Sequence, residues 1–166
     1  MRVLDQLKTY TKHELAEGLG QLNTALSGLQ RNLLSFVREY DRRRLWERDG
    51  YRHMGHWLAA HFGVTISEGL RWTTAAHALE KLPSISGAFE RGVLSFDKVL
   101  QLARFATPED EKHLLKWATR ASVNAIRRKA DLANRPSLEE TRDAFEDRFL
   151  EWWWHDDGTR LGIGGL

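Results

Sequence analysis

Apolar residues recur with a helical period along almost the whole chain. The most regular run is a heptad pattern, with alternating steps of four and three that place every member on one side of a helix. Its members are Leu15, Leu19, Leu22, Leu26, Leu29, Leu33, Phe36 and Tyr40. The pattern predicts one long helix within residues 1–48. Two uses of its apolar side stay open: burial against the rest of the domain, or a coiled-coil homodimer with Leu19, Leu26 and Leu33 at the contact.

Residues 49–135 contain shorter helical runs that are divided by turn and capping residues. The expected boundaries are a turn at Asp49-Gly50, the end of a helix at Pro83, and helix starts at Ser95, at Thr107-Pro108 and at Ser122. This segment is therefore expected to be a compact helical core.

Two of these helices, at about 53–62 and 66–82, have the rhythm of a helix-turn-helix motif. Gly63 lies in the short turn between them, and Gly69 and Leu70 are expected to begin the buried side of the second helix. In DNA-binding proteins with this motif, the second helix enters the major groove. The same spacing also fits two core helices that pack at an angle without touching DNA.

Three residues of the second helix would point outward in such a motif: Ser67, Arg71 and Thr74. Arg71 could donate hydrogen bonds to guanine and Thr74 to a phosphate, whereas Glu68 would repel the DNA backbone unless it accepts from cytosine. These residues are the candidate base-reading surface.

Residues 136–166 differ in character from the rest of the chain. Ser137 predicts one more helix start, and the turn signal "HDDG" after three adjacent tryptophans predicts a short hairpin. The expected fold is all-α: a helical bundle with a long N-terminal helix, a helix-turn-helix-like core and a short C-terminal β-like hairpin.

Net charge is only +2, but the charges are unevenly distributed. Residues 1–135 hold 22 Lys and Arg against 15 Asp and Glu, while residues 136–166 hold 3 against 8. A basic body suits a polyanion, unless the acidic end folds back and neutralises it. Two clusters could contact phosphates: Arg42, Arg43 and Arg44, and Arg127, Arg128 and Lys129. Ordinary solvated surface is the alternative for both.

The sequence gives little support for disulfides, metal sites or catalytic residues. There is no Cys, so disulfides, thiolate metal sites and cysteine nucleophiles are excluded. His53, His56 and His61 lack the spacing of a helical zinc site, and no catalytic motif stands out. We expect no catalytic residues, no metal or cofactor in this chain, no small-molecule substrate, no membrane segment, and a cytoplasmic location.

Several motifs together resemble a known family. They are "HWLAAHFGVT", "ALEKLP", "AFERGVLSFDKV", "ATPEDE" and "EWWWHDDGTRLGI". In combination they resemble the domain of unknown function 222 (DUF222), also called the 13E12-repeat family, of bacteria and their phages. Long members of that family carry a C-terminal HNH endonuclease domain, which binds a divalent metal. No HNH motif occurs in this sequence.

The resemblance implies a helical module of a DNA-processing protein, without its catalytic part. Two functions follow as hypotheses. The first is a non-catalytic DNA-binding module associated with an HNH endonuclease. The second is a helical interaction or dimerisation scaffold that binds no nucleic acid.

Overall fold

The computed structural model describes residues 7–135, 150–154 and 161–165. The chain divides into two units, Met1–Ala133 and Asn134–Leu166. All regular secondary structure described in the first unit is helical, which confirms the all-α class. The predicted helix at Ser137 lies outside the described residues.

The longest element is α2, Lys12–Arg42. Thr11 and Glu14 fix its start as a reciprocal capping box: the Thr11 hydroxyl accepts from the Glu14 backbone N–H at 3.3 Å, and the Glu14 carboxylate accepts from the Thr11 N–H at 2.7 Å. The Thr11 N–H and the Thr11 hydroxyl, which donates to the same carboxylate at 2.8 Å, hold the pKa of Glu14 below its usual value. The predicted long helix is confirmed.

Seven further helices follow in the first unit. They are α3 (Leu45–Arg48), α4 (Met54–Phe62), α5 (Ile66–Lys81), α6 (Pro83–Glu90), α7 (Phe96–Leu102), α8 (Glu111–Ala118) and α9 (Val123–Ala133). Ser95 caps α7 and Ser122 accepts from the Ala125 N–H, as predicted. The predicted start at Thr107-Pro108 is early, because residues 108–110 form a turn in which the Asp110 N–H donates to the Thr107 hydroxyl.

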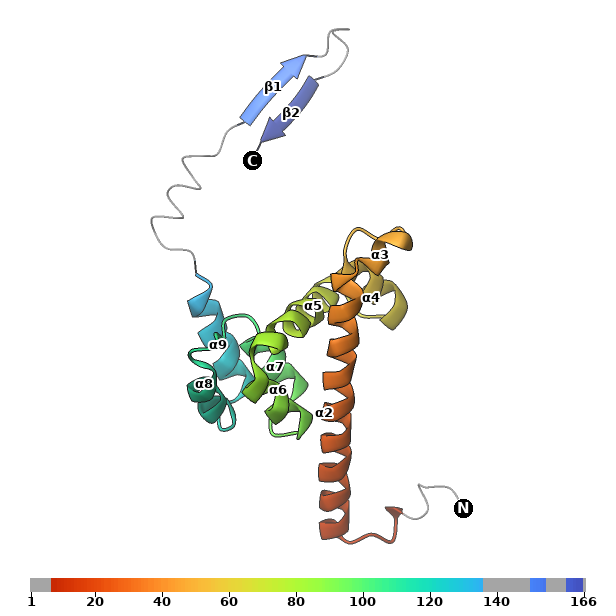
Figure 1. Cartoon of the computed structure of the whole chain (residues 1–166), viewed down its shortest axis with the longest axis vertical. Coiled ribbons are helices and arrows are strands. Elements are labelled where there is room, and N and C mark those ends of the chain that lie inside the picture. The colour runs from red at the N-terminus through yellow and green to blue at the C-terminus, as the bar shows by residue number, and fades with distance from the viewer. Residues whose placement is uncertain (1–6, 136–149, 155–160, 166) are drawn as a thin grey trace. The chain divides into compact units, whose positions relative to one another are not determined.

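The core lies where α5 and α6 pack on the C-terminal half of α2 and where α7 and α9 pack together (Figure 1). Its largest fully buried side chains come from several helices and the loops between them: Leu34, Met54, Leu58, Leu82, Ile85, Phe89, Leu94, Leu102 and Ile126. The fold thus holds α5, α7 and α9 in fixed relative positions.

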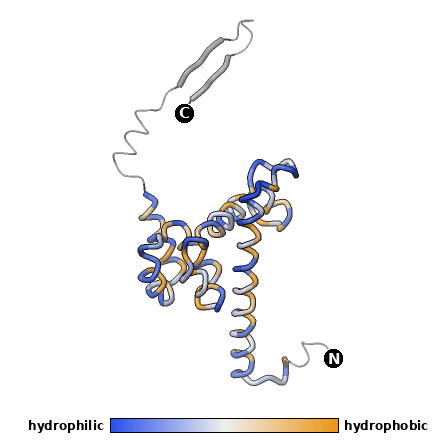
Figure 2. The backbone as a smooth tube through the Cα atoms, in the orientation of Figure 1, coloured by the Kyte–Doolittle hydropathy of each residue, from blue (hydrophilic) through white to orange (hydrophobic). Residues whose placement is uncertain are grey.

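The side of α2 that meets the core is not the heptad side. Its buried residues are Ser27, Leu34 and Val37, whereas most of the heptad residues are exposed. Only Leu33 and Tyr40, near the C-terminal end, pack partly against the core. Figure 1 shows the N-terminal end of α2 extending beyond the other helices, and Figure 2 shows apolar residues recurring along this end as well.

In the second unit, β1 (Leu150–Trp154) and β2 (Leu161–Gly165) form a two-stranded antiparallel sheet. Leu150 pairs with Gly165, and Trp154 pairs with Leu161. Residues 155–160, which contain the predicted "HDDG" turn, lie outside the described residues. None of the helices described in the chain is both long and apolar enough to cross a membrane.

Candidate nucleic-acid interface

The turn between α4 and α5 is set by three residues. Gly63 ends α4 with a φ of 68°, in the left-handed region that favours glycine. Thr65 then caps α5, because its hydroxyl accepts from the Glu68 backbone N–H at 3.1 Å. The two predicted helices and the turn between them are therefore confirmed as local structure.

Two glycines set the distance between α4 and α5. A Cβ added to Gly69 would lie 2.6 Å from the carbonyl oxygen of Gly55, so the backbones touch directly. The predicted burial of Gly69 is confirmed, but that of Leu70 is wrong: Leu70 is 44% exposed and covers Gly55 from the outside. Because neither glycine has a side chain, α5 lies close to α4 with its opposite side in solvent.

That outward side of α5 carries all three predicted base-reading residues. Ser67, Arg71 and Thr74 are exposed. The Ser67 hydroxyl lies 3.1 Å from that of Thr65, and the Thr74 hydroxyl donates to the Leu70 carbonyl at 3.0 Å. Arg71 forms a loose ion pair with Glu68, with 3.5 Å between Nη1 and Oε2. A pair of this length and exposure stabilises the protein little.

The second predicted basic cluster lies on α9, whose Ile126 and Ala130 are buried. Arg127, Arg128 and Lys129 occupy exposed positions between them. The ammonium of Lys129 lies over the Trp117 ring at 5.1 Å from its centre. The side chains of Arg127 and Arg128 have no ion pair or hydrogen bond with any residue that the structure describes.

A hollow of about 550 Å³ joins the outward side of α5 to α9. Its lining comes from three helices and a residue two positions after α7: Leu70, Arg71, Thr74, Leu100, Gln101, Arg104 and Arg127. The structure thus brings Arg71 and Thr74 together with Arg127, and adds a third guanidinium, that of Arg104. Arg104 donates to Gln101 at 2.9 Å and forms an ion pair with Asp131 at 2.7 Å.

The side chains of the first predicted basic cluster, Arg42–Arg44, are engaged in ion pairs within the chain. Glu39 accepts from Arg42 at 2.7 Å and from Arg43 at 2.6 Å, and Arg44 pairs with Glu47. These hydrogen bonds lower the pKa of Glu39 to about 2. All three arginines are exposed, but each is already paired with a carboxylate, and none of them lines the hollow.

The sequence model of one protein family, described as a domain of unknown function, DUF222, matches residues 16–160. The chain belongs to the DUF222 family. The match includes α5, α7 and α9, which line the hollow, and α4, which packs on α5. No curated protein and no solved structure matches the chain.

Sequence reasoning missed two residues of this DUF222 surface. Gly55 was not recognised as the crossing partner of Gly69, although a glycine in the first turn of a helix is a usable signal. Arg104 was missed because its place beside Arg71 and Arg127 depends on how α7 packs. No local pattern predicts that proximity.

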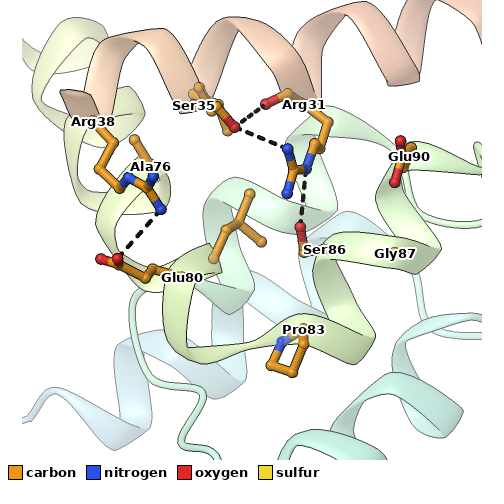
Figure 3. A pocket seen from close by; sticks show the side chains of 11 residues that line it. Arg31, Ser35, Arg38, Ala76, Glu80, Pro83, Ser86, Gly87 and Glu90 are labelled. Atoms are coloured by element: carbon orange, nitrogen blue, oxygen red, sulfur yellow. Dashed lines mark hydrogen bonds and ion pairs between the residues drawn. The ribbon is translucent and has the colours of Figure 1, made fainter. Parts of the chain in front are cut away.

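A second hollow, of about 300 Å³, lies between α2, α5 and α6 of the same DUF222 unit (Figure 3). Its arginines make internal contacts. Arg31 donates to Ser86 at 3.2 Å and to Ser35 at 3.0 Å, and Arg38 pairs with Glu80 at 3.4 Å. Since these contacts join α2 to α5 and α6, we interpret this hollow as structural.

Among the residues that the structure describes, no group of three or more His, Cys, Asp or Glu could hold a metal ion.

The predicted dimerisation residues are divided between two environments: Leu19 and Leu26 are exposed, whereas Leu33 is partly buried against the core.

Proposed function

We propose that this DUF222 chain is a non-catalytic DNA-binding module. The binding surface combines the outward side of α5 with the basic cluster of α9. In this proposal Arg71 and Thr74 lie at the groove, Ser67 lies beside them, and Arg127, Arg128 and Lys129 contact phosphates.

The observation that carries the proposal is the hollow between α5 and α9. Three guanidinium groups line one concave surface: those of Arg71 and Arg127, of which only Arg71 has a loose ion pair, and that of Arg104, which is already paired with Asp131 at 2.7 Å. Guanidinium groups bind phosphate oxygens through several N–H donors at once. The hollow is therefore suited to a phosphate of the DNA backbone, with the exposed arginine and lysine of α9 extending the contact along the strand.

The helix pair α4–α5 supports the same proposal as a helix-turn-helix. The Gly55–Gly69 contact keeps the two helices close, and the outward side of α5 stays uncovered by any helix that the structure describes. Arg71 must exchange its Glu68 partner for DNA, and the length of that pair, 3.5 Å, makes the exchange inexpensive.

The resemblance to family members with an HNH endonuclease domain favours DNA over other polyanions. In such a protein the module would hold DNA while a separate domain cuts it. A role on bacterial DNA would also place the protein in the cytoplasm. The Arg42–Arg44 cluster would then contribute less to binding than the α9 cluster, since Glu39 and Glu47 already engage it.

The test is a fluorescence anisotropy titration of a labelled mixed-sequence duplex at 50 and 200 mM NaCl. We expect affinity to fall steeply with salt, because each phosphate contact releases counterions. The double variant Arg71→Ala/Arg127→Ala should bind more weakly, and its log–log salt slope should be smaller by about 2.

A matched control removes two exposed lysines that do not line the hollow, in the variant Lys12→Ala/Lys81→Ala. It has the same net charge as the test variant and should bind nearly as well as the parent protein. Equal losses in both variants would mean diffuse charge attraction without a site. Absence of binding at 50 mM NaCl would exclude DNA as the partner and favour the alternative, a scaffold that binds only protein.

A further inference from the structure

One side of α2 carries a row of exposed apolar side chains, most densely in its N-terminal half. We call it the leucine stripe and define it as Leu15, Leu19, Leu22, Leu26, Leu29 and Phe36. The six side chains are 39%, 69%, 69%, 53%, 68% and 77% exposed, respectively. Along a helix with a rise of 1.5 Å per residue, the stripe is about 32 Å long.

The described helices of the first unit do not cover this stripe. Ser27, Leu34 and Val37 lie on another side of α2 and face α5 and α6. On a helix with 100° between residues, that side is about a quarter-turn away from the stripe. Packing of α2 into the described part of the domain therefore leaves the stripe accessible, as the extended end of α2 in Figure 1 illustrates.

The leucine stripe has the low charge and the large apolar area of a protein–protein interface. No charged residue occurs from Gly18 to Gln30. The six side chains expose on the order of 700 Å² of apolar surface, more than the roughly 300–600 Å² of the largest patch on a typical monomer. A standard interface buries about 800 Å² on each partner. The stripe alone thus supplies most of the area that one half of a stable dimer needs.

We propose that the leucine stripe is covered by the same stripe of a second copy of this chain. The alternating steps of four and three let identical helices interlock, since each side chain enters a gap between four residues of its mate. A self-complementary surface of this kind suits a two-fold dimer. Because no charged residue occurs from Gly18 to Gln30, no charge repulsion opposes self-association along this middle part of the stripe. This proposal stands independently of DNA binding.

The first experiment measures molar mass by light scattering and sedimentation from about 1 to 200 μM protein. We expect twice the chain mass for the parent protein and the chain mass for Leu22→Glu/Leu29→Glu. Glutamate is a good helix former, so helicity by circular dichroism should be unchanged. The control Leu132→Glu changes a leucine on α9 that is 60% exposed and should remain dimeric.

The second experiment uses the absence of cysteine from the sequence. Leu26 lies near the middle of the stripe, so it comes close to its mate whether the helices run parallel or antiparallel. A Leu26→Cys variant should therefore form an intermolecular disulfide under mild oxidation, and Leu132→Cys should not. A parent protein that is monomeric at all concentrations, or equal cross-linking of both variants, would overturn the proposal.

The monomeric variant also separates this proposal from the one on DNA. Its stripe substitutions leave Arg71 and Arg127 unchanged, so any DNA affinity of a single module should persist in it. Loss of dimerisation with retained binding would support both proposals, whereas a dimer that binds no DNA would support this one and overturn the other.

Discussion

Two basic runs of the chain have nearly the same composition: Arg42–Arg44 at the end of α2 and Arg127–Lys129 on α9. They differ in whether their arginine side chains are paired with carboxylates. Glu39 lies three residues before Arg42 and four before Arg43, and it binds both. The residue in the same position relative to Arg127 and Arg128 is Asn124, which has no charge. Arg127 and Arg128 accordingly have no carboxylate partner among the described residues.

This difference shows that a basic cluster is defined by its helical neighbours as well as by its own residues. Side chains three and four apart lie on the same side of a helix. Glu39 is ionised at neutral pH, and the same hydrogen bonds to Arg42 and Arg43 that lower its pKa to about 2 compete with phosphate for both guanidinium groups. On α9, Asp131 lies four residues after Arg127 and three after Arg128, but it pairs with Arg104 at 2.7 Å. Arg127 and Arg128 therefore keep no carboxylate partner among the described residues and can bind a phosphate directly.

The largest effect is expected from removing each pair of arginines in turn. Arg127→Ala/Arg128→Ala should weaken DNA binding by roughly tenfold or more at low salt, because two unpaired phosphate contacts are lost. Arg42→Ala/Arg43→Ala removes the same charge but should weaken binding less than about threefold, because those arginines are already paired. Anisotropy titrations of both variants decide this. Equal losses would show that the ion pairs of Glu39 do not protect the first cluster.

A smaller effect follows from giving α9 the carboxylate that α2 already has. Asn124→Glu places an acid three and four residues before Arg127 and Arg128, in the position that Glu39 occupies on α2. DNA affinity should fall by roughly threefold to tenfold with every arginine retained. An acid in the first turn of a helix is favourable, so the melting temperature should not fall. Asn124→Gln is the neutral control, and an equal loss in it would contradict the electrostatic explanation.

The converse change should have a smaller effect still. Glu39→Gln keeps the length of the side chain and removes the charge that holds Arg42 and Arg43. We expect DNA affinity to rise by about twofold to threefold and the salt slope to steepen by up to about 1. Titrations at several salt concentrations measure both. Unchanged affinity and slope would mean that the end of α2 does not reach the DNA even when its arginines are released.

Most of the local structure could be predicted from the sequence. Helical periodicity, Gly63 and the capping residues Thr65, Ser95 and Ser122 act within one turn of the chain, so α2, α4, α5, α7 and α9 could be predicted. The helix start predicted at Thr107-Pro108 was too early. Proline at the first position of a helix is also favoured in a turn, and residues 108–110 form such a turn.

The remaining features depend on contacts between distant residues. The heptad of α2 shows an apolar side, but the covered side is that of Ser27, Leu34 and Val37, which depends on how α5 and α6 pack. Arg104 lies beside Arg127 and binds Asp131, 27 residues away along the chain. The pairing of Arg42 and Arg43 with Glu39 is local instead. It could have been predicted from the sequence, because residues three and four apart lie on the same side of a helix.

The smallest effect concerns the acid titration of Glu39 itself. A pKa lowered from 4.5 to about 2 means that the ion pairs are complete above pH 4.5 and are lost only as the pH falls through about 2. Their contribution to stability should therefore be constant between pH 5 and 8. The carboxyl carbon shift of Glu39, followed by NMR from about pH 7 to pH 3, should stay nearly flat. In Arg42→Ala/Arg43→Ala it should titrate near the ordinary value for glutamate. A midpoint near 4.5 in both proteins would mean that Glu39 does not hold the two arginines in solution, and the contrast between the clusters would then disappear.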